Sequence, residues 1–210
     1  MFAIVATADD TTVTITPSPM ADLRGFLWTN AITLQAGETY QTGDSCNPGD
    51  DVTGTWITSD KPVAVFAGAN LAEVPDDSAP AANPLAQELL PVDMWGTQAL
   101  ALSLAGRTGG DSYRVLAAYT NTVVWTNGMV AGTNQAGQFL DLLIDGPVEF
   151  KGSQPIQVAQ FANGVYFDHP PFDRGDPCEI LLPPAGHYLV TNTVFTLPAT
   201  ALRETLTRTS

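Results

Sequence analysis

The sequence predicts an all-β protein built from two related β-sandwich-like units in tandem, with one short helix near residues 84–90. The first observation is composition: 18 Gly and 16 Pro among 210 residues indicate many turns, and 44% hydrophobic residues suffice for a packed core. The second is a series of short β-prone segments along the whole chain. The third is a set of sequence markers that occurs twice in one order.

Strand-like segments rich in Val, Ile, Thr and aromatic residues alternate with Gly, Pro, Asn and Asp. The segments are 2–7, 11–16, 31–37, 38–43, 53–59, 62–68, 97–106, 112–119, 122–127, 137–144, 147–152, 155–161 and 187–197. Strands this short and this closely spaced predict a sandwich or a barrel.

One segment carries helix signals instead. Asn83 is a favoured capping residue, Pro84 suits the first helical position, and LAQELL continues to Pro91. We therefore expect the short helix here.

Four markers recur with offsets that fall along the chain. They pair FAIVATADDTTV (2–13) with YRVLAAYTNTVV (113–124), QAGE (35–38) with QAGQ (135–138), Pro62 with Pro155, and LLP (89–91) with LLP (181–183). Four matches in one order predict an internal repeat; the alternative is convergent strand and turn composition. The predicted units are 1–111 and 112–210, packed together as one module cut from a longer protein. Each has the length of a small sandwich of about 100 residues.

The negative net charge of the chain limits the kinds of partner that it can bind. The chain has 22 acidic against 8 basic residues and a formal net charge of −14, which excludes nucleic acid as a partner because phosphate binding needs a basic surface. No run reaches the roughly 18 apolar residues of a membrane helix, so no membrane insertion is expected. The start of the chain also lacks the pattern of an intact secretory precursor.

Five of the aspartates lie near two predicted turns. Asp44, Asp50 and Asp51 lie near one turn, and Asp173 and Asp176 near the other. Neither group has the spacing of a dedicated calcium loop, so these are weak calcium candidates and solubility is the simpler interpretation. No other cofactor is expected.

The two cysteines both lie in polar loops, Cys46 in SCNPGDD and Cys178 in DRGDPCEI. An even count permits one disulfide bridge in an oxidising compartment. It would close a loop of about 130 residues and contribute roughly 4–5 kcal/mol in the chain-entropy model. The alternative is two free thiols in loops that lie far apart.

The sequence contains no nucleophile elbow, phosphate-binding loop, zinc-protease motif or C-x-x-C. Asp168 beside His169 resembles a base with its orienting carboxylate, but a surface histidine is the commoner case. Arg174-Gly175-Asp176 is interpreted as a chance integrin-type tripeptide. The tryptophans are expected in core or cross-strand packing rather than on a sugar-stacking surface; they are Trp28, Trp56, Trp95 and Trp125.

Several of these segments carry a family resemblance. FAIVATADDTTVTITPS, LQAGETYQ, DDVTGTWITSDKPVAVFAGAN, QELLPVDMWG, DSYRVLAAYTNTVV and DPCEILLPP, in this order, resemble the N-terminal domain of IgGFc-binding proteins. The resemblance implies a β-rich extracellular module with no established catalytic role. Two cysteines often present in the family are missing here, and no N-x-[ST] sequon occurs, which favours a bacterial source.

Together these features predict a non-catalytic extracellular or cell-surface module for adhesion or ligand binding. The expected ligand is a glycan or a protein, and the expected neighbours are other domains of the same polypeptide. One alternative is a structural subunit that self-associates through exposed strand edges. The second is a carbohydrate-active enzyme domain.

Overall fold

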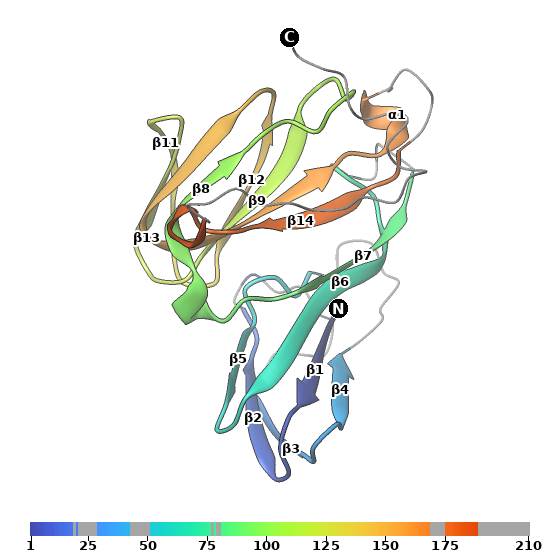
Figure 1. Cartoon of the computed structure of the whole chain (residues 1–210), viewed down its shortest axis with the longest axis vertical. Helices are drawn as coiled ribbons and strands as arrows, with labels where there is room; N and C mark the ends of the chain where they lie inside the picture. The colour runs from blue at the N-terminus through green and yellow to red at the C-terminus, as the bar shows by residue number, and fades with distance from the viewer. Residues whose placement is uncertain are drawn as a thin grey trace.

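The computed structural model describes residues 1–18, 20, 29–42, 51–76, 78, 81–168 and 175–188. The prediction of an all-β fold is confirmed. The described strands form two units, which lie one above the other in Figure 1. We call β1–β7 the first unit and β8–β14 the second unit, while the division into 1–111 and 112–210 expected from the sequence stays a prediction. No helix in the described parts of the chain is long and apolar enough to span a membrane.

The first unit has two sheets, ordered β4-β1-β6-β7 and β3-β2-β5. Its strands are β1 (Phe2–Ala6), β2 (Thr11–Thr16), β3 (Asn30–Leu34), β4 (Thr39–Thr42), β5 (Trp56–Ser59), β6 (Val63–Ala72) and β7 (Asn83–Glu88). Alternate residues of β1 and β2 are buried, as the two-residue period of a strand requires. The buried residues form one core: Phe2, Ile4, Ala6, Val13, Ile15 and Leu34.

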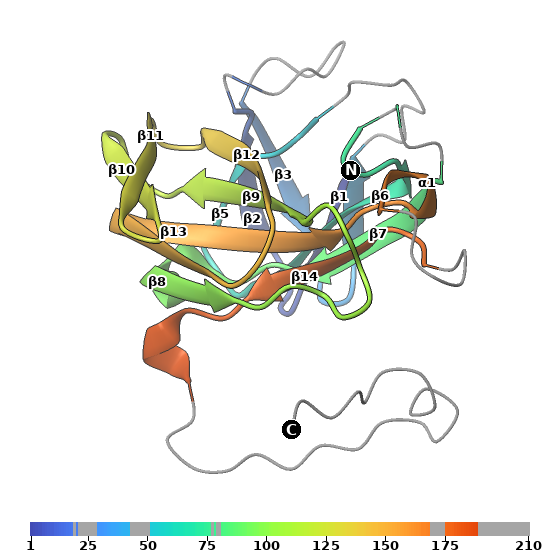
Figure 2. The same cartoon turned by 90° about the horizontal axis from the view of Figure 1, so that it is seen from above.

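The second unit is organised around one long strand. Its strands are β8 (Gly96–Ala101), β9 (Asp111–Ala117), β10 (Thr122–Thr126), β11 (Met129–Asn134), β12 (Phe139–Ile144), β13 (Val148–Ala162) and β14 (Cys178–Leu182). The first half of β13 pairs with β10 and β8, and its second half pairs with β9 and β14. Figure 2 shows β13 running across the unit with β8 and β14 beside it. The core around it includes Tyr113, Val115, Phe150, Ile156 and Val158.

Apart from the pairing of β8, the strand pairings of the two units correspond. β1 pairs with β4 and β6 as β9 pairs with β12 and the second half of β13, and β2 pairs with β3 and β5 as β10 pairs with β11 and the first half of β13. The registers agree as well. Phe2 lies opposite Ala67 as Tyr113 lies opposite Gln160. Duplication as the origin of this correspondence stays a prediction.

The marker turns also correspond. Gly37 donates its N–H to the Ala6 carbonyl at 2.9 Å, and Gly137 donates to the Ala117 carbonyl at 3.0 Å. Both glycines have positive φ, +80° and +75°, which side chains disfavour. The QAG sequence therefore recurs because each unit closes the same turn.

The prediction of a short helix near residues 84–90 is wrong. Residues 83–88 form β7, which pairs antiparallel with β6, and their burial alternates residue by residue. A segment of six or seven residues is too short to hold a helix by propensity alone, so the free edge of β6 decided its conformation. The described α-helix is α1 (Val165–Asp168), and two 3₁₀ turns, η1 (Val92–Met94) and η2 (Ala185–His187), follow β7 and β14.

Candidate functional site

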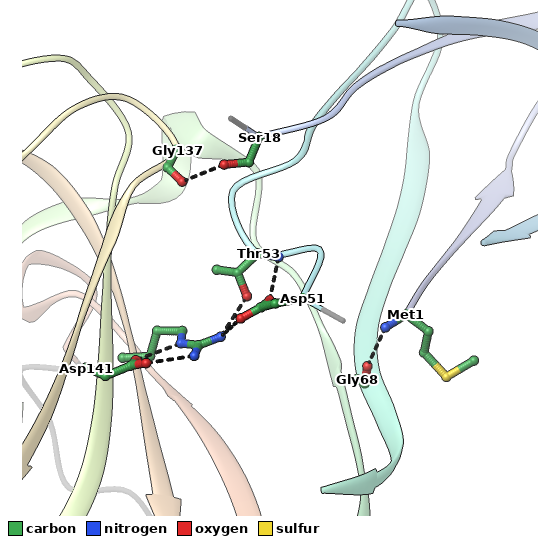
Figure 3. A network of polar contacts seen from close by, with 8 residues as sticks. Met1, Ser18, Asp51, Thr53, Gly68, Gly137 and Asp141 are labelled. Carbon is green, nitrogen blue, oxygen red and sulfur yellow. Dashed lines mark hydrogen bonds and ion pairs between the residues drawn. The ribbon is translucent and has the colours of Figure 1, made fainter. Parts of the chain in front are cut away.

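A polar network joins the two units (Figure 3). Arg114 on β9 forms a bidentate ion pair with Asp141 of β12, with both N···O distances at 2.8 Å. Its Nη1 also donates to the first unit, to Asp51 Oδ2 at 2.7 Å and to Thr53 Oγ1 at 2.9 Å. The guanidinium lies 3.9 Å from the ring centroid of Phe139. The planar guanidinium donates to Asp141 on one side and to Asp51 and Thr53 on the other, and so holds the loop of residues 51–53 in one orientation on the second unit.

Burial and charge oppose each other in this network. Burial alone would raise the pKa of Asp51, but the Arg114 charge and two hydrogen bonds from Thr53 outweigh it and hold the pKa below its ordinary value. Burial would lower the pKa of Arg114, but its carboxylate partners hold it above the usual value. Burial raises the pKa of nearby Glu179. The shifts of Asp51 and Arg114 follow from structural ion pairing.

Two glycines bring the backbones of the units into contact beside the network. A Cβ on Gly54 would lie 1.9 Å from the Gly137 carbonyl oxygen, so no side chain fits there. The same oxygen accepts a hydrogen bond from Ser18 Oγ at 3.2 Å (Figure 3). The QAG turn of the second unit is thus covered by the first unit, whereas no described atom lies within 4 Å of the corresponding Cβ position at Gly37.

The calcium candidates do not come together in the described structure. Asp51 already uses both carboxylate oxygens, because Oδ1 accepts the Thr53 N–H at 2.8 Å and Oδ2 binds Arg114. Asp44, Asp50 and Asp173 lie outside the described residues, and Asp176 lies between Gly175 and β14. Within the described ranges no three acidic, histidine or cysteine side chains form a group that could hold a metal ion. Calcium binding stays a prediction.

Cys178 is exposed at the first position of β14, and its predicted partner Cys46 lies outside the described residues. The disulfide bridge therefore stays a prediction.

His169, Arg174 and Trp28 also lie outside the described residues. The other three tryptophans are half-buried rather than core residues: Trp56, Trp95 and Trp125.

A second polar cluster is buried inside the second unit. Asp111 is 1% exposed, and its Oδ2 accepts from the Leu104 N–H at 2.8 Å and from Gln160 Nε2 at 2.9 Å. Asp111 Oδ1 and the hydroxyl of Tyr113 have no described hydrogen-bond partner. Burial, and then the Asp111 charge, raise the pKa of Tyr113 to about 12. A carboxylate this buried cannot reach a substrate, so we interpret the cluster as structural.

The first unit has an open strand edge at β5. Among the described strands, β5 pairs with β2 alone, in the order β3-β2-β5. The Asp60 N–H bonds to the Thr12 carbonyl at 3.2 Å, just beyond the end of this pairing. Since backbone groups alternate in direction along a strand, Trp56 and Thr58 face β2, and Ile57 and Ser59 present their N–H and C=O groups to the open edge.

In the second unit β8 covers the corresponding edge. It pairs antiparallel with the first half of β13, with Phe150 opposite Ala99 and Val148 opposite Ala101. Phe150 is 0% exposed and Ile156 is 4% exposed. The corresponding residues of the first unit, Ile57 and Val63, are only half-buried.

A buried polar atom marks the same place. Thr55 Oγ1, just before β5, is buried without a hydrogen-bond partner among the described residues. Such atoms are rare and need an explanation. Sequence reasoning missed this edge. The clue was the segment 97–106, which lies between the two sets of markers and has no partner within the first unit.

The fold is all-β, and an arginine-centred ion-pair network joins its two groups of strands, β1–β7 and β8–β14. The sequence profile of a family described as IgGFc binding protein matches residues 1–209, and the chain belongs to this family. The resemblance predicted from the sequence is thereby confirmed.

One human relative, IgGFc-binding protein of Homo sapiens, is 25% identical over 205 residues. The match covers 94% of this chain and 4% of that protein, so the chain spans a small part of its relative's length. No solved structure significantly matches this chain.

Proposed function

We propose that this chain is a non-catalytic extracellular or cell-surface module that binds protein and serves in adhesion as part of a larger polypeptide. Family membership supports a protein ligand and an extracellular location, because the human relative is named for binding the Fc region of IgG. The observation that carries the proposal is the open β5 edge. Its outward backbone groups are a template on which a partner strand can add.

The charge of the chain favours protein over most surface glycans. A net charge of −14 repels sulfated and sialylated sugars but attracts basic protein surfaces. Glycan binding is therefore the second choice of ligand. It would use the half-buried tryptophans rather than the strand edge.

The test measures binding of the full 210-residue chain to purified IgG Fc and to a glycan array. We expect binding to protein that weakens in Ser59→Pro, because proline removes an outward-facing N–H while the pairing of β5 with β2 is kept. The matched control is Ser59→Ala, which keeps that N–H. Binding that Ser59→Pro leaves unchanged would exclude the edge as the site.

The carbohydrate-active enzyme is the weaker alternative. Turnover of any glycan on the array, lost on changing a single carboxylate, would replace the binding function by catalysis.

A self-associating structural subunit is the second candidate function. The same open edge favours it, because unpaired edges also join copies of one chain.

A further inference from the structure

We infer that the β5 edge of one chain binds residues 189–197 of a second copy as an added antiparallel strand, so that the chain associates head to tail. This inference deepens the proposed function by naming one protein partner for the open edge. Within one chain, β8 follows the first unit in the sequence and pairs with β13 of the second unit. Residues 189–197 follow the second unit in the same way and would pair with β5 of another molecule.

The 3₁₀ turn before β8 and the 3₁₀ turn before residue 189 have the same backbone conformation at both ends. η1 begins after Pro91, with φ/ψ of −63°/151°, and ends at Trp95, with −73°/154°. η2 begins after Pro184, with −61°/143°, and ends at Tyr188, with −67°/140°. The closing bonds also match: Trp95 donates to Val92 at 3.1 Å, and Tyr188 donates to Ala185 at 3.2 Å. Both turns thus release the chain in the same local conformation.

Adding 93 to the residue numbers of η1 gives those of η2, and adding 93 to the residue numbers of β8 gives 189–194. The segment 189–197 reads LVTNTVFTL, and its Val and Thr residues suit a strand. The same shift carries β5 onto the first half of β13, since Val13 lies opposite Ser59 as Val124 lies opposite Gly152. Donor and acceptor therefore share one register.

That register places specific residues opposite each other. The observed pair Val148 and Ala101 corresponds to Thr55 opposite Val194 of the second copy. The observed pair Phe150 and Ala99 corresponds to Ile57 opposite Asn192 of the second copy. Ala99 and Ala101 are 4% and 5% exposed, so the donor residues at their positions would enter the core of the first unit.

Asn192 would then lie diagonal to Thr55, whose hydroxyl has no partner among the described residues. Val194 and Asn192 would cover the half-buried face of Ile57.

The junction between the units would not be repeated between molecules. At the position of Arg114 the first unit has Ala3, which cannot form the ion pair. Strand addition alone would hold the copies, against repulsion between two chains of charge −14. We therefore expect reversible association that strengthens with salt.

The experiment measures the molar mass of the full chain by light scattering and sedimentation over a range of concentrations, at low and high salt. We expect a shift from monomer to dimers and longer chains as concentration and salt rise. Val194→Asp places a charge at a core-facing donor position and should reduce the association constant at least tenfold. The matched control is Thr193→Asp, at the position of exposed Leu100, and should leave it within about twofold.

Hydrogen exchange of residues 56–59 supplies the second measurement. Protection of Ile57 and Ser59 should rise with protein concentration in the wild-type chain and in Thr193→Asp, but not in Val194→Asp. A monomer at every concentration would overturn the inference. So would association that Val194→Asp leaves unchanged, or protection of β5 in a monomer, which would mean that the chain covers its own edge. Fc binding by a strictly monomeric chain would reject self-association and leave the proposed function standing.

Discussion

The two units share strand order and register but differ at one edge. In the second unit β5 and β6 are replaced by one continuous strand, β13, and β8 covers its first half. In the first unit the corresponding edge, β5, is open. Pro62 shows the same difference, since it lies just before β6 whereas Pro155 lies inside β13. The seven strands of the first unit therefore leave uncovered an edge whose counterpart in the second unit is covered by β8.

The covered core should tolerate truncation less well than the open one. Phe150→Ala removes a fully buried ring that packs against Tyr113, with ring centroids 5.0 Å apart, and should lower the free energy of unfolding by about 3–5 kcal/mol. Ile57→Ala, at the corresponding half-buried site, should cost about 1–2 kcal/mol because less area leaves the core. Urea unfolding of both variants measures the difference. Equal losses would mean that covering the edge adds nothing to the core.

The junction between the units gives the next largest effect. Gly54→Ala forces a Cβ against the Gly137 carbonyl and should cost about 2–4 kcal/mol, through overpacking together with a positive φ of +84°. Gly37→Ala is the matched control: its φ is +80°, but no described atom lies within 4 Å of the added Cβ. It should cost only about 1–2 kcal/mol. Thermal unfolding separates the two, and an equal loss would remove the close contact as a determinant.

Acid should weaken the junction before it weakens the units. The pKa of Asp51 is lowered in the folded chain from its ordinary value of 3.8, so the stability it contributes is present above that value. It is lost as pH falls through the lowered folded pKa. Arg114→Leu should remove this dependence and cost about 1–2 kcal/mol at neutral pH, because the pair is partly exposed. Unfolding measured from pH 7 to pH 2 checks both points. Parallel profiles for the wild-type chain and the variant would rule out the pair as the source.

The smallest effect should be the same in both units. The Thr11 hydroxyl donates to the Ala8 carbonyl at 2.6 Å, and the Thr122 hydroxyl donates to the Tyr119 carbonyl at 2.6 Å. Both threonines are 0% exposed. Thr→Val at either site should cost about 1 kcal/mol, the net value of one hydrogen bond. Denaturant unfolding of the two variants should agree within about 0.5 kcal/mol, and a larger difference would show that the two turns are not equivalent.

Much of the fold could be predicted from local pattern. Segments such as 2–7 and 122–127 were recognised as strands because alternation and turn residues are local properties of a strand. The markers predicted which turns would correspond, since Asp10 and Asn121 adopt positive φ at equivalent places. The open edge of β5 was not recognised, because an edge is open only where a neighbouring strand is missing from the assembled sheet.

The sequence by itself determined the fold class, the family and the positions of most strands, because these depend on composition, period and turn chemistry along the chain. Only the tertiary structure decided the conformation of 83–88, the partner of Asp51 and the strand that covers β13. The free edge of β6 overrode helix propensity, Arg114 lies 63 positions from Asp51, and β8 pairs with β13 although four strands lie between them in the sequence. Each of these outcomes depends on a contact between distant segments, whose geometry is set only when the sheets assemble.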